Sequence, residues 1–110
     1  MMILTTTAVL PGAEVEAYLG IVTAEVVYGS NAIRDFFAGI RDIIGGRTGS
    51  YERLFEQGQR EAIAELERRG QRLGATAVIG ISLTTGTINL DATGVLLLIT
   101  ATGTAIKLKP

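Results

Sequence analysis

The charged side chains of this sequence are distributed very unevenly along the chain. Of its 10 basic and 11 acidic residues, ten lie in residues 50–73, whereas residues 74–106 carry only Asp91. Charged side chains are almost never buried unless they are paired, so the first segment predicts a solvated helix and the second a buried sheet. The chain must therefore lay a polar helix against an apolar sheet.

Apolar periodicity and turn residues divide the chain into six elements and one hairpin. In chain order we expect strands at 3–7 and 15–28, helices at 31–44 and 50–73, and strands at 75–85 and 95–108, the last two joined by a hairpin at 86–94. Gly20 indicates a bulge in the second strand, and Ser50 is the expected N-cap of the second helix. The order β-β-α-α-β-β predicts an α+β domain of two layers, with a largely antiparallel sheet and helices on one face.

The first helix carries a continuous apolar stripe on one side. Its members recur at helical spacing and are Ile33, Phe36, Phe37, Ile40, Ile43 and Ile44. The triplet Ile-Arg-Asp occurs twice, seven residues apart, so Arg34 with Asp35 and Arg41 with Asp42 fall on nearly the same face. This helix therefore presents two Arg-Asp pairs beside its apolar stripe.

The last strand begins with apolar residues on both of its faces. Leu96 and Leu98 alternate with Val95, Leu97 and Ile99. In a chain of only 110 residues, a strand buried on both faces needs a second layer that the chain itself does not supply. A neighbouring subunit is the expected source of that layer.

Composition excludes several classes of function. The chain has no His and no Cys, which removes zinc fingers, Cys–His and Ser–His–Asp catalytic systems, and a disulfide framework. A net charge of -1 argues against non-specific nucleic-acid binding, which relies on an excess of Lys and Arg. The strongly apolar run at 95–99 is far too short to span a membrane. We expect a cytoplasmic protein that binds neither nucleic acid nor membrane.

Long stretches of the sequence resemble the YbjQ family of small bacterial proteins, whose function is undetermined and which carry a heavy-metal-binding label. The resemblance covers nearly the whole chain and is most specific in Asn31-x-x-Arg34-Asp35, followed by Ile40-Arg41-Asp42-Ile43-x-Gly45-Gly46-Arg47 and by Gly49-Ser50-Tyr51-Glu52. Further matching stretches are Leu73-Gly74-Ala75-x-Ala77-Val78-x-Gly80-Ile81 and Thr100-Ala101-x-Gly103-Thr104-Ala105. The resemblance implies a dodecin-like subunit that assembles into a homopentameric ring with the help of short extra strands.

Polar residues of the two helices form the main candidate site. They are Arg34, Asp35, Arg41, Asp42, Arg47 and Glu52. The planar fork of an Arg side chain binds a carboxylate or phosphate with two hydrogen bonds, so this surface is a candidate site for a small anionic ligand or a protein partner. Charges on an otherwise apolar helix also serve assembly. Salt bridges between the subunits of a ring are therefore the alternative interpretation.

The remaining candidate sites carry weaker signals. Residues 45–50 form a Gly-rich segment before a helix, which suits either anion binding through backbone N–H groups or a plain connection. Soft metals need thiolates or imidazoles, so only a hard-cation site, for example a ring of Glu25 or Asp91, is left for a metal. Glu25 lies in an apolar strand and is expected either at a sheet edge or opposite a partner across an interface.

No residue is assigned to catalysis. Tyr18, Tyr28, Tyr51 and Glu25 are the groups that could titrate into a useful range, but none is paired with a nucleophile or base at a recognisable spacing. We therefore expect no enzyme, no cofactor and no dedicated metal site. The expected function is a non-enzymatic, homo-oligomeric binding or scaffold module. The alternative is a binder of small ligands or metal ions with sites between subunits.

Overall fold

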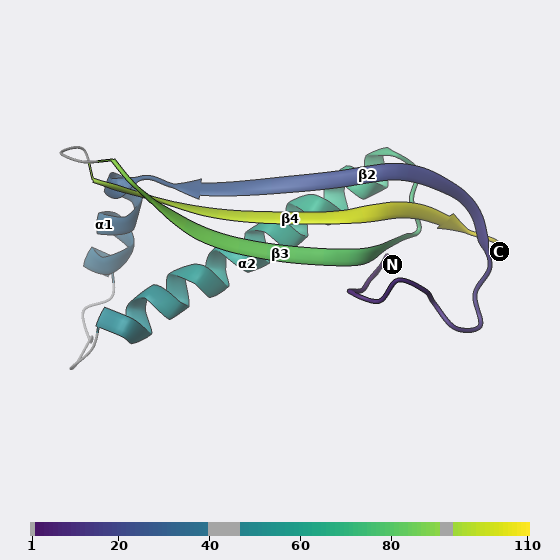
Figure 1. Cartoon of the computed structure of the whole chain (residues 1–110), viewed down its shortest axis with the longest axis horizontal. Coiled ribbons are helices and arrows are strands. Elements are labelled where there is room, and N and C mark those ends of the chain that lie inside the picture. Colours follow the sequence, from purple (N-terminus) through teal and green to yellow (C-terminus); the bar gives the residue numbers. More distant parts are fainter. Residues whose placement is uncertain (1, 40–46, 91–93) are drawn as a thin grey trace.

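The computed structural model describes residues 2–39, 47–90 and 94–110, in which a helix crosses one face of a four-stranded sheet (Figure 1). The elements are β1 Ile3–Leu4, β2 Val15–Tyr28, α1 Ser30–Gly39, α2 Arg47–Arg72, β3 Ala77–Asn89 and β4 Val95–Leu108. The long helix α2 lies behind the sheet in Figure 1, and α1 stands at the end where β3 and β4 are joined. The expected α+β architecture with helices on one face is confirmed.

The sheet has the strand order β1-β3-β4-β2, with β4 paired antiparallel to both β2 and β3. The expectation of an antiparallel sheet is wrong in one respect, because β1 pairs parallel with β3 at Ala77 and Val78, and the sheet is mixed. The N-terminal segment continues along this edge after β1, since the carbonyl oxygens of Thr7 and Thr5 accept hydrogen bonds from the N–H groups of Gly80 and Ile81.

The core lies between α2 and the face of the sheet that it covers. From α2 it receives Leu54, Ala62 and Leu66, and from β4 it receives Leu97, Ile99, Ala101 and Ala105. Leu97 is 1% exposed and Ile99 is fully buried. These residues of β4 alternate along the strand, as a sheet with one covered face requires.

Two glycines allow this close packing. A Cβ atom at Gly103 of β4 would lie 2.6 Å from Cγ1 of Val78, and one at Gly58 of α2 would lie 3.1 Å from the ring of Tyr28. The absence of a side chain at both positions brings the helix and the strands together.

The face of the sheet opposite α2 is called the open face below. On it lie Ile21, Thr23, Glu25 and Val27 of β2, which are all exposed. Among the described residues, its covered part is a small cluster of Ala77, Ile79 and Ile106, against which Leu10, Val15 and Leu108 pack. The rest of the open face carries no second layer from the described part of the chain.

Several strand predictions are confirmed and others need correction. The bounds of β2 and β4 are as expected, and the register of β2 shifts between Tyr18 and Gly20, where Gly20 has φ 118°. The first strand is shorter than expected and ends at Leu4. The third strand begins two residues later than expected and continues to Asn89, because pairing with β4 persists through the positions expected in the hairpin.

The helix bounds also differ from the expectation. α1 begins at Ser30, and the expected continuation through residues 40–44 lies outside the described residues. α2 begins at Arg47, so Ser50 is not its N-cap and residues 47–50 are not a loop. The stability of a helix in a protein comes mostly from the packing of its apolar face rather than from local propensity. The well-packed face of α2 thus extends the helix over Thr48 and Gly49.

The predicted buried sheet at residues 74–106 is only half correct. Residues 82–90 of the described chain are all exposed, including Leu83 and Ile88. On β4, Leu96 and Leu98 are half-buried, and on the other face Leu97 and Ile99 are buried whereas Val95 is exposed. α2 diverges from β3 toward this end of the molecule (Figure 1), and the described part of the chain therefore leaves the end of the sheet uncovered.

Candidate functional site

The described residues of the predicted polar site belong to α1 and to the first turns of α2, which lie at one end of the molecule (Figure 1). Arg34 and Asp35 are exposed on α1, and Glu52 is exposed in the first half of α2. Arg47 is the first residue of α2, and its side chain lies outside the described part of the structure. Arg41 and Asp42 also lie outside the described residues.

The start of α1 is fixed to the sheet by a side chain that sequence reasoning did not select. The hydroxyl of Ser30 accepts a hydrogen bond from the N–H of Val95 at 3.0 Å and donates one to the carbonyl of Val95 at 3.2 Å. Gly94 next to it has φ 110°, and a Cβ there would meet Ser30. The first residue of α1, the helix that carries Arg34 and Asp35, is therefore bonded to the beginning of β4.

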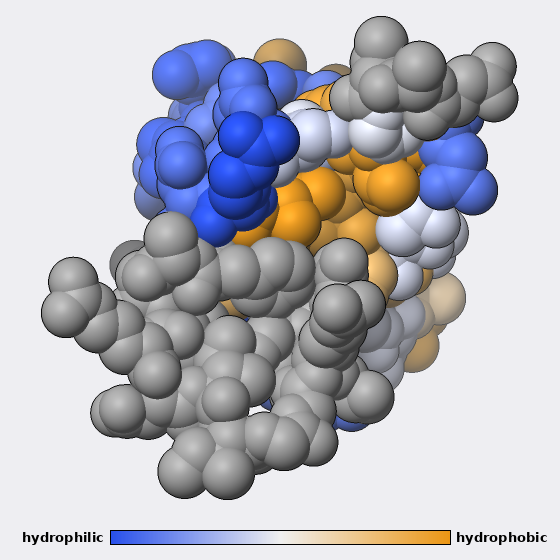
Figure 2. Space-filling model, turned by 90° about the vertical axis from the view of Figure 1, so that its left-hand side faces the viewer, coloured by the Kyte–Doolittle hydropathy of each residue, from blue (hydrophilic) through white to orange (hydrophobic). Residues whose placement is uncertain are grey.

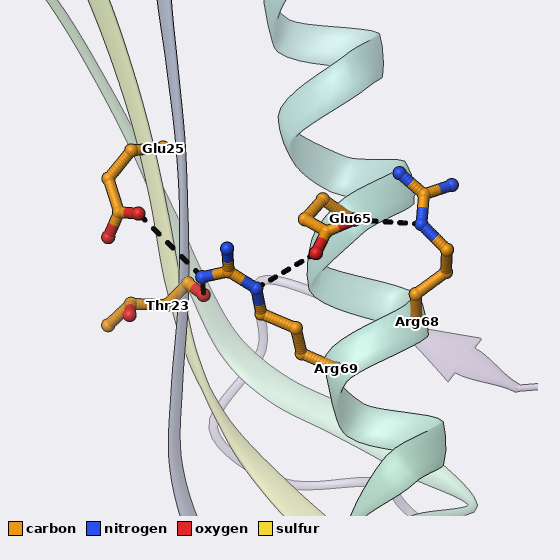
Figure 3. Close-up of polar contacts among 5 residues, drawn as sticks. All are labelled: Thr23, Glu25, Glu65, Arg68 and Arg69. Carbon is orange, nitrogen blue, oxygen red and sulfur yellow. Dashed lines mark hydrogen bonds and ion pairs between the residues drawn. The ribbon is translucent and has the colours of Figure 1, made fainter.

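A second polar cluster joins α2 to the edge strand β2 (Figure 3). The guanidinium of Arg69 donates through Nε to Glu65 at 3.0 Å, and its Nη1 lies 3.7 Å from the carboxylate of Glu25. The same Nη1 donates a short hydrogen bond to the backbone carbonyl of Thr23. We call Thr23, Glu25, Glu65 and Arg69 the Arg69 bridge.

Within the Arg69 bridge, the pKa of Glu65 is lowered. Hydrogen bonds from Arg68, at 2.8 Å, and from Arg69 lower the pKa of Glu65 below its ordinary value. Because these groups are partly exposed, the bridge contributes little to global stability. Its clearest structural effect is to place a charged side chain on the outer edge of β2.

A tyrosine–carboxylate pair lies at the contact between β2 and α2. The hydroxyl of Tyr28 donates to Glu61 at 2.7 Å, and Gln57 donates to the other oxygen of Glu61 at 3.3 Å. Burial, the hydrogen bond to Glu61 and the negative charge of Glu61 raise the pKa of Tyr28 to about 12. A phenol held protonated in this way is a poor nucleophile or base near neutral pH, and the pair acts as a contact between layers.

The donor set of the chain does not suit soft metals. Such metals prefer thiolate and imidazole ligands, and the sequence contains neither Cys nor His and only two Met residues. Within residues 2–39, 47–90 and 94–110, no three acidic side chains gather into a group that could hold a metal ion. The same part of the chain contains no helix that is long and apolar enough to cross a membrane.

Of the Arg69 bridge, the sequence singles out only Glu25. Glu25 was expected at a sheet edge or opposite a partner, and it lies at the edge, opposite Arg69 of the same chain. Arg69 itself was missed, although its spacing of four residues from Glu65 is the spacing of a helical ion pair. No local sequence pattern indicates that α2 crosses the sheet in a way that brings Arg69 to the carbonyl of Thr23.

Comparisons with known proteins agree on one family. A family model described as "putative heavy-metal-binding" matches residues 2–109. The UPF0145 protein of Nostoc punctiforme is 77% identical over 108 residues, which are 98% of this chain and 100% of the relative. The UPF0145 protein of Synechocystis is 67% identical over 105 residues, which are 96% of this chain and 97% of the relative.

The fold also matches a solved structure. A protein of unknown function from Pediococcus pentosaceus, assigned to the DUF74 family, superimposes with a TM-score of 0.66. The match covers 98% of both chains at 19% sequence identity, so this likeness concerns the fold alone. With a family model that spans almost the whole sequence and relatives of high identity over nearly their full length, the chain belongs to the YbjQ family.

Proposed function

We propose that this protein is the subunit of a cytoplasmic, non-enzymatic, homo-oligomeric ring, a pentamer, that works as a binding or scaffold module. The observation that carries the proposal is the large and apolar surface of the single chain. Its accessible surface is 7169 Å², whereas a compact monomer of this mass exposes about 5,800 Å². The chain has a radius of gyration of 17.1 Å against about 13 Å for a compact domain of this length.

The surplus is large enough for extensive contacts between subunits. It amounts to about 1,300 Å², whereas each partner in a standard interface buries about 800 Å². The choice of a ring follows the family resemblance, and in a ring each subunit makes two contacts, one with each neighbour.

Exposed apolar side chains support the same proposal. On the open face, Ile21 is 81% exposed, Tyr18 71% and Val27 55%. At the end that carries α1 and the β3–β4 connection, Figure 2 shows an apolar area between hydrophilic side chains. Exposed apolar residues at this end are Ile88 of β3, Leu90 and Val95 of β4. Exposed apolar surface of this kind is typical of subunit contacts.

The polar residues of α1 and α2 would supply the specific contacts of the module. Arg34, Asp35 and Glu52 are exposed, and Ser30 joins the start of α1 to β4. Together with Arg41, Asp42 and Arg47, they would bind a partner or a small anionic ligand, or they would form salt bridges between subunits. The first use makes the ring a recognition surface, and the second makes these residues part of the assembly.

The experiment is multi-angle light scattering of the purified chain, followed by the double variant Arg34→Ala/Arg41→Ala. A mass near that of a pentamer supports the proposal, and a stable species of 11.6 kDa would rule it out. A double variant that no longer assembles assigns the Arg residues to subunit contacts. A double variant that assembles but no longer retains a partner recovered with the wild type assigns them to recognition. The matched control is Arg60→Ala, which removes an exposed Arg from the middle of α2.

The open face favours a second candidate, a site for small ligands or hard metal ions between subunits. The carboxylate of Glu25 shares that face with the hydroxyls of Thr23, Thr84, Thr100 and Thr102. Oxygen donors of this type suit Ca²⁺ or Mg²⁺, whereas the donor set does not fit the soft metals that the family description suggests. Calorimetric titration with Ca²⁺, Mg²⁺, Zn²⁺, phosphate and flavin is the test. Heat that is abolished by Glu25→Gln supports the site, and flat traces with every probe eliminate it.

A further inference from the structure

We propose that the outer edge of β3, at residues 82–89, pairs in parallel with the outer edge of β2 of the next copy, so that one sheet continues around the ring. The proposal rests on the homo-oligomer proposed above and specifies its junction. It follows from the bare edge of β3, from the protection of β2, and from the direction in which the backbone groups of both strands point.

Within residues 2–39, 47–90 and 94–110, nothing pairs with the edge of β3 over its second half. The N-terminal segment covers the first half, through backbone bonds from Thr5 to Val78 and from β3 back to Thr5 and Thr7. Residues 82–89 lie beyond that cover and contain no charge and no proline. Natural proteins protect long exposed edges with charges, prolines or bulges. An uncharged run rich in Thr, Leu and Ile on an edge therefore indicates a strand that another strand covers.

The edge of β2 is protected in its first half and at Thr23. Its register shifts twice before Ile21, and Arg69 occupies the carbonyl of Thr23 and pairs with the charge of Glu25. Thr23 lies at the same level of the sheet as Ser82, because both are paired with Thr102 of β4. Among the described residues, no strand covers β2 beyond Thr23 or β3 from Ser82, and these two open edges lie at the same end of the sheet.

At alternate residues of β3, the backbone N–H and C=O groups point away from β4. We call these outward residues, and the residues between them, whose groups point toward β4, inward residues. The N–H of Val95 bonds to Ser30, on the side of β4 away from β3, so that its register partner Asn89 also points away from β4. In an antiparallel ladder this direction alternates, and Leu83, Thr85 and Thr87 therefore point outward as well. Their register partners on β4 lie under α2, and directly opposed residues share a face. The outward residues of β3 thus carry their side chains on the helix-covered face.

The backbone of β2 points outward at residues with the opposite placement. The carbonyl of Thr23 is bonded from outside by Arg69, and by the same alternation Glu25 and Val27 also point outward. Their partners on β4 are Thr102, Thr100 and Leu98, which lie on the open face. The outward residues of β2 thus carry their side chains on the open face.

This difference decides the direction of the junction. An antiparallel pair sets outward residue against outward residue, which would put the helices of neighbouring copies on opposite faces of the sheet. A parallel pair sets an outward residue of one strand beside an inward residue of the other, and all helices then stay on one face. Strands β2 and β3 both run antiparallel to β4 and so run the same way. Rotation about an axis along the strands leaves the strand direction unchanged. In a cyclic ring with such an axis, β3 of one copy therefore runs parallel to β2 of the next.

The first experiment removes one outward N–H group. Thr85→Pro deletes a donor that points away from β4, where proline is tolerated in an edge strand, and Thr85→Val is the matched control that keeps the N–H. We expect light scattering to show the full ring for the wild type and Thr85→Val, and a shift toward single chains for Thr85→Pro with its sheet circular dichroism retained. Thr85→Pro rings of undiminished mass would overturn the junction and leave the ring itself intact. A wild type that is monomeric would overturn both proposals.

The second experiment identifies the partner strand and does not depend on how proline is tolerated. The chain contains no Cys, so Thr84→Cys can be combined in turn with Thr23→Cys, Glu25→Cys or Val27→Cys on the open face. Oxidation should give a ladder of covalent multimers in at least one combination, and no product with any single variant. Covalent dimers from Thr84→Cys alone would show that β3 pairs with itself and would contradict the proposed junction.

Discussion

At the scale of single residues, the decisive positions are those where a side chain is absent. Gly103 lies in the centre of β4, and a Cβ there would lie 2.6 Å from Val78 Cγ1 and 3.3 Å from the carbonyl oxygen of Ile79. Val78 is fully buried and β-branched, which leaves it little freedom to move aside. The close approach of Gly103 to Val78 and Ile79 therefore leaves no room for a side chain at position 103.

We expect Gly103→Ala to destabilise the fold by about 1–3 kcal/mol, as overpacking of a core does. Gly29→Ala is the matched control, because a Cβ at Gly29 would meet only Cδ2 of Leu96 at 3.8 Å, an ordinary van der Waals contact. The control should change the free energy of unfolding by less than about 0.5 kcal/mol. Urea denaturation of both variants measures the difference, and equal effects would show that the contact with Val78 is relieved at little cost.

At the scale of the elements, most of the fold was accessible from sequence. The β-branched run of β2 and the apolar alternation of β4 set the bounds of both strands. The start of α2 and the end of β3 were misjudged because each lies where local propensity is weak and packing or pairing extends the element. Thr48 and Gly49 enter a helix whose later turns are buried, and residues 86–89 remain a strand because β4 pairs with them.

Helix α2 is joined to β2 by the Arg69 bridge, and its loss should be felt at the edge strand. We expect Arg69→Ala to cost up to about 1 kcal/mol, as exposed ion pairs do, and to lose this effect at high salt. Arg68→Ala is the matched control, since Arg68 bonds to Glu65 on its own helix. Hydrogen exchange should accelerate at Val22 and Ala24, whose N–H groups point toward β4, in Arg69→Ala alone. Equal exchange in the two variants would show that the bridge does not hold the edge.

At the scale of the whole molecule, the sequence predicts the two layers but not how far one covers the other. The charge distribution predicted a polar helix against an apolar sheet, and the structure confirms it. It could not predict that α2 covers only part of the sheet, because the angle at which a helix crosses a sheet depends on contacts such as that of Gly58 with Tyr28. The candidate site is accessible from sequence only as a set of residues, because the position of α1 depends on contacts between residues far apart in the chain, such as that of Ser30 with Val95.

A chain with this much exposed apolar surface should gain stability from association. We expect its melting temperature to rise as protein concentration increases, because binding to other copies stabilises the folded state by mass action. Differential scanning calorimetry over a hundredfold range of concentration measures the shift. The folded Thr85→Pro variant serves as the control and should show a smaller one. A melting temperature independent of concentration in the wild type would mean that folding and assembly are not coupled.

The pair formed by Tyr28 and Glu61 has a practical consequence. The chain has no Trp and three Tyr residues, so its ultraviolet emission comes from tyrosine alone. A phenol that donates a hydrogen bond to a carboxylate can pass its proton on excitation and loses much of its normal emission. Separation of α2 from β2 would restore that emission at Tyr28. The protein therefore contains a built-in optical signal for the contact between its two layers, and its folding can be followed without any added dye.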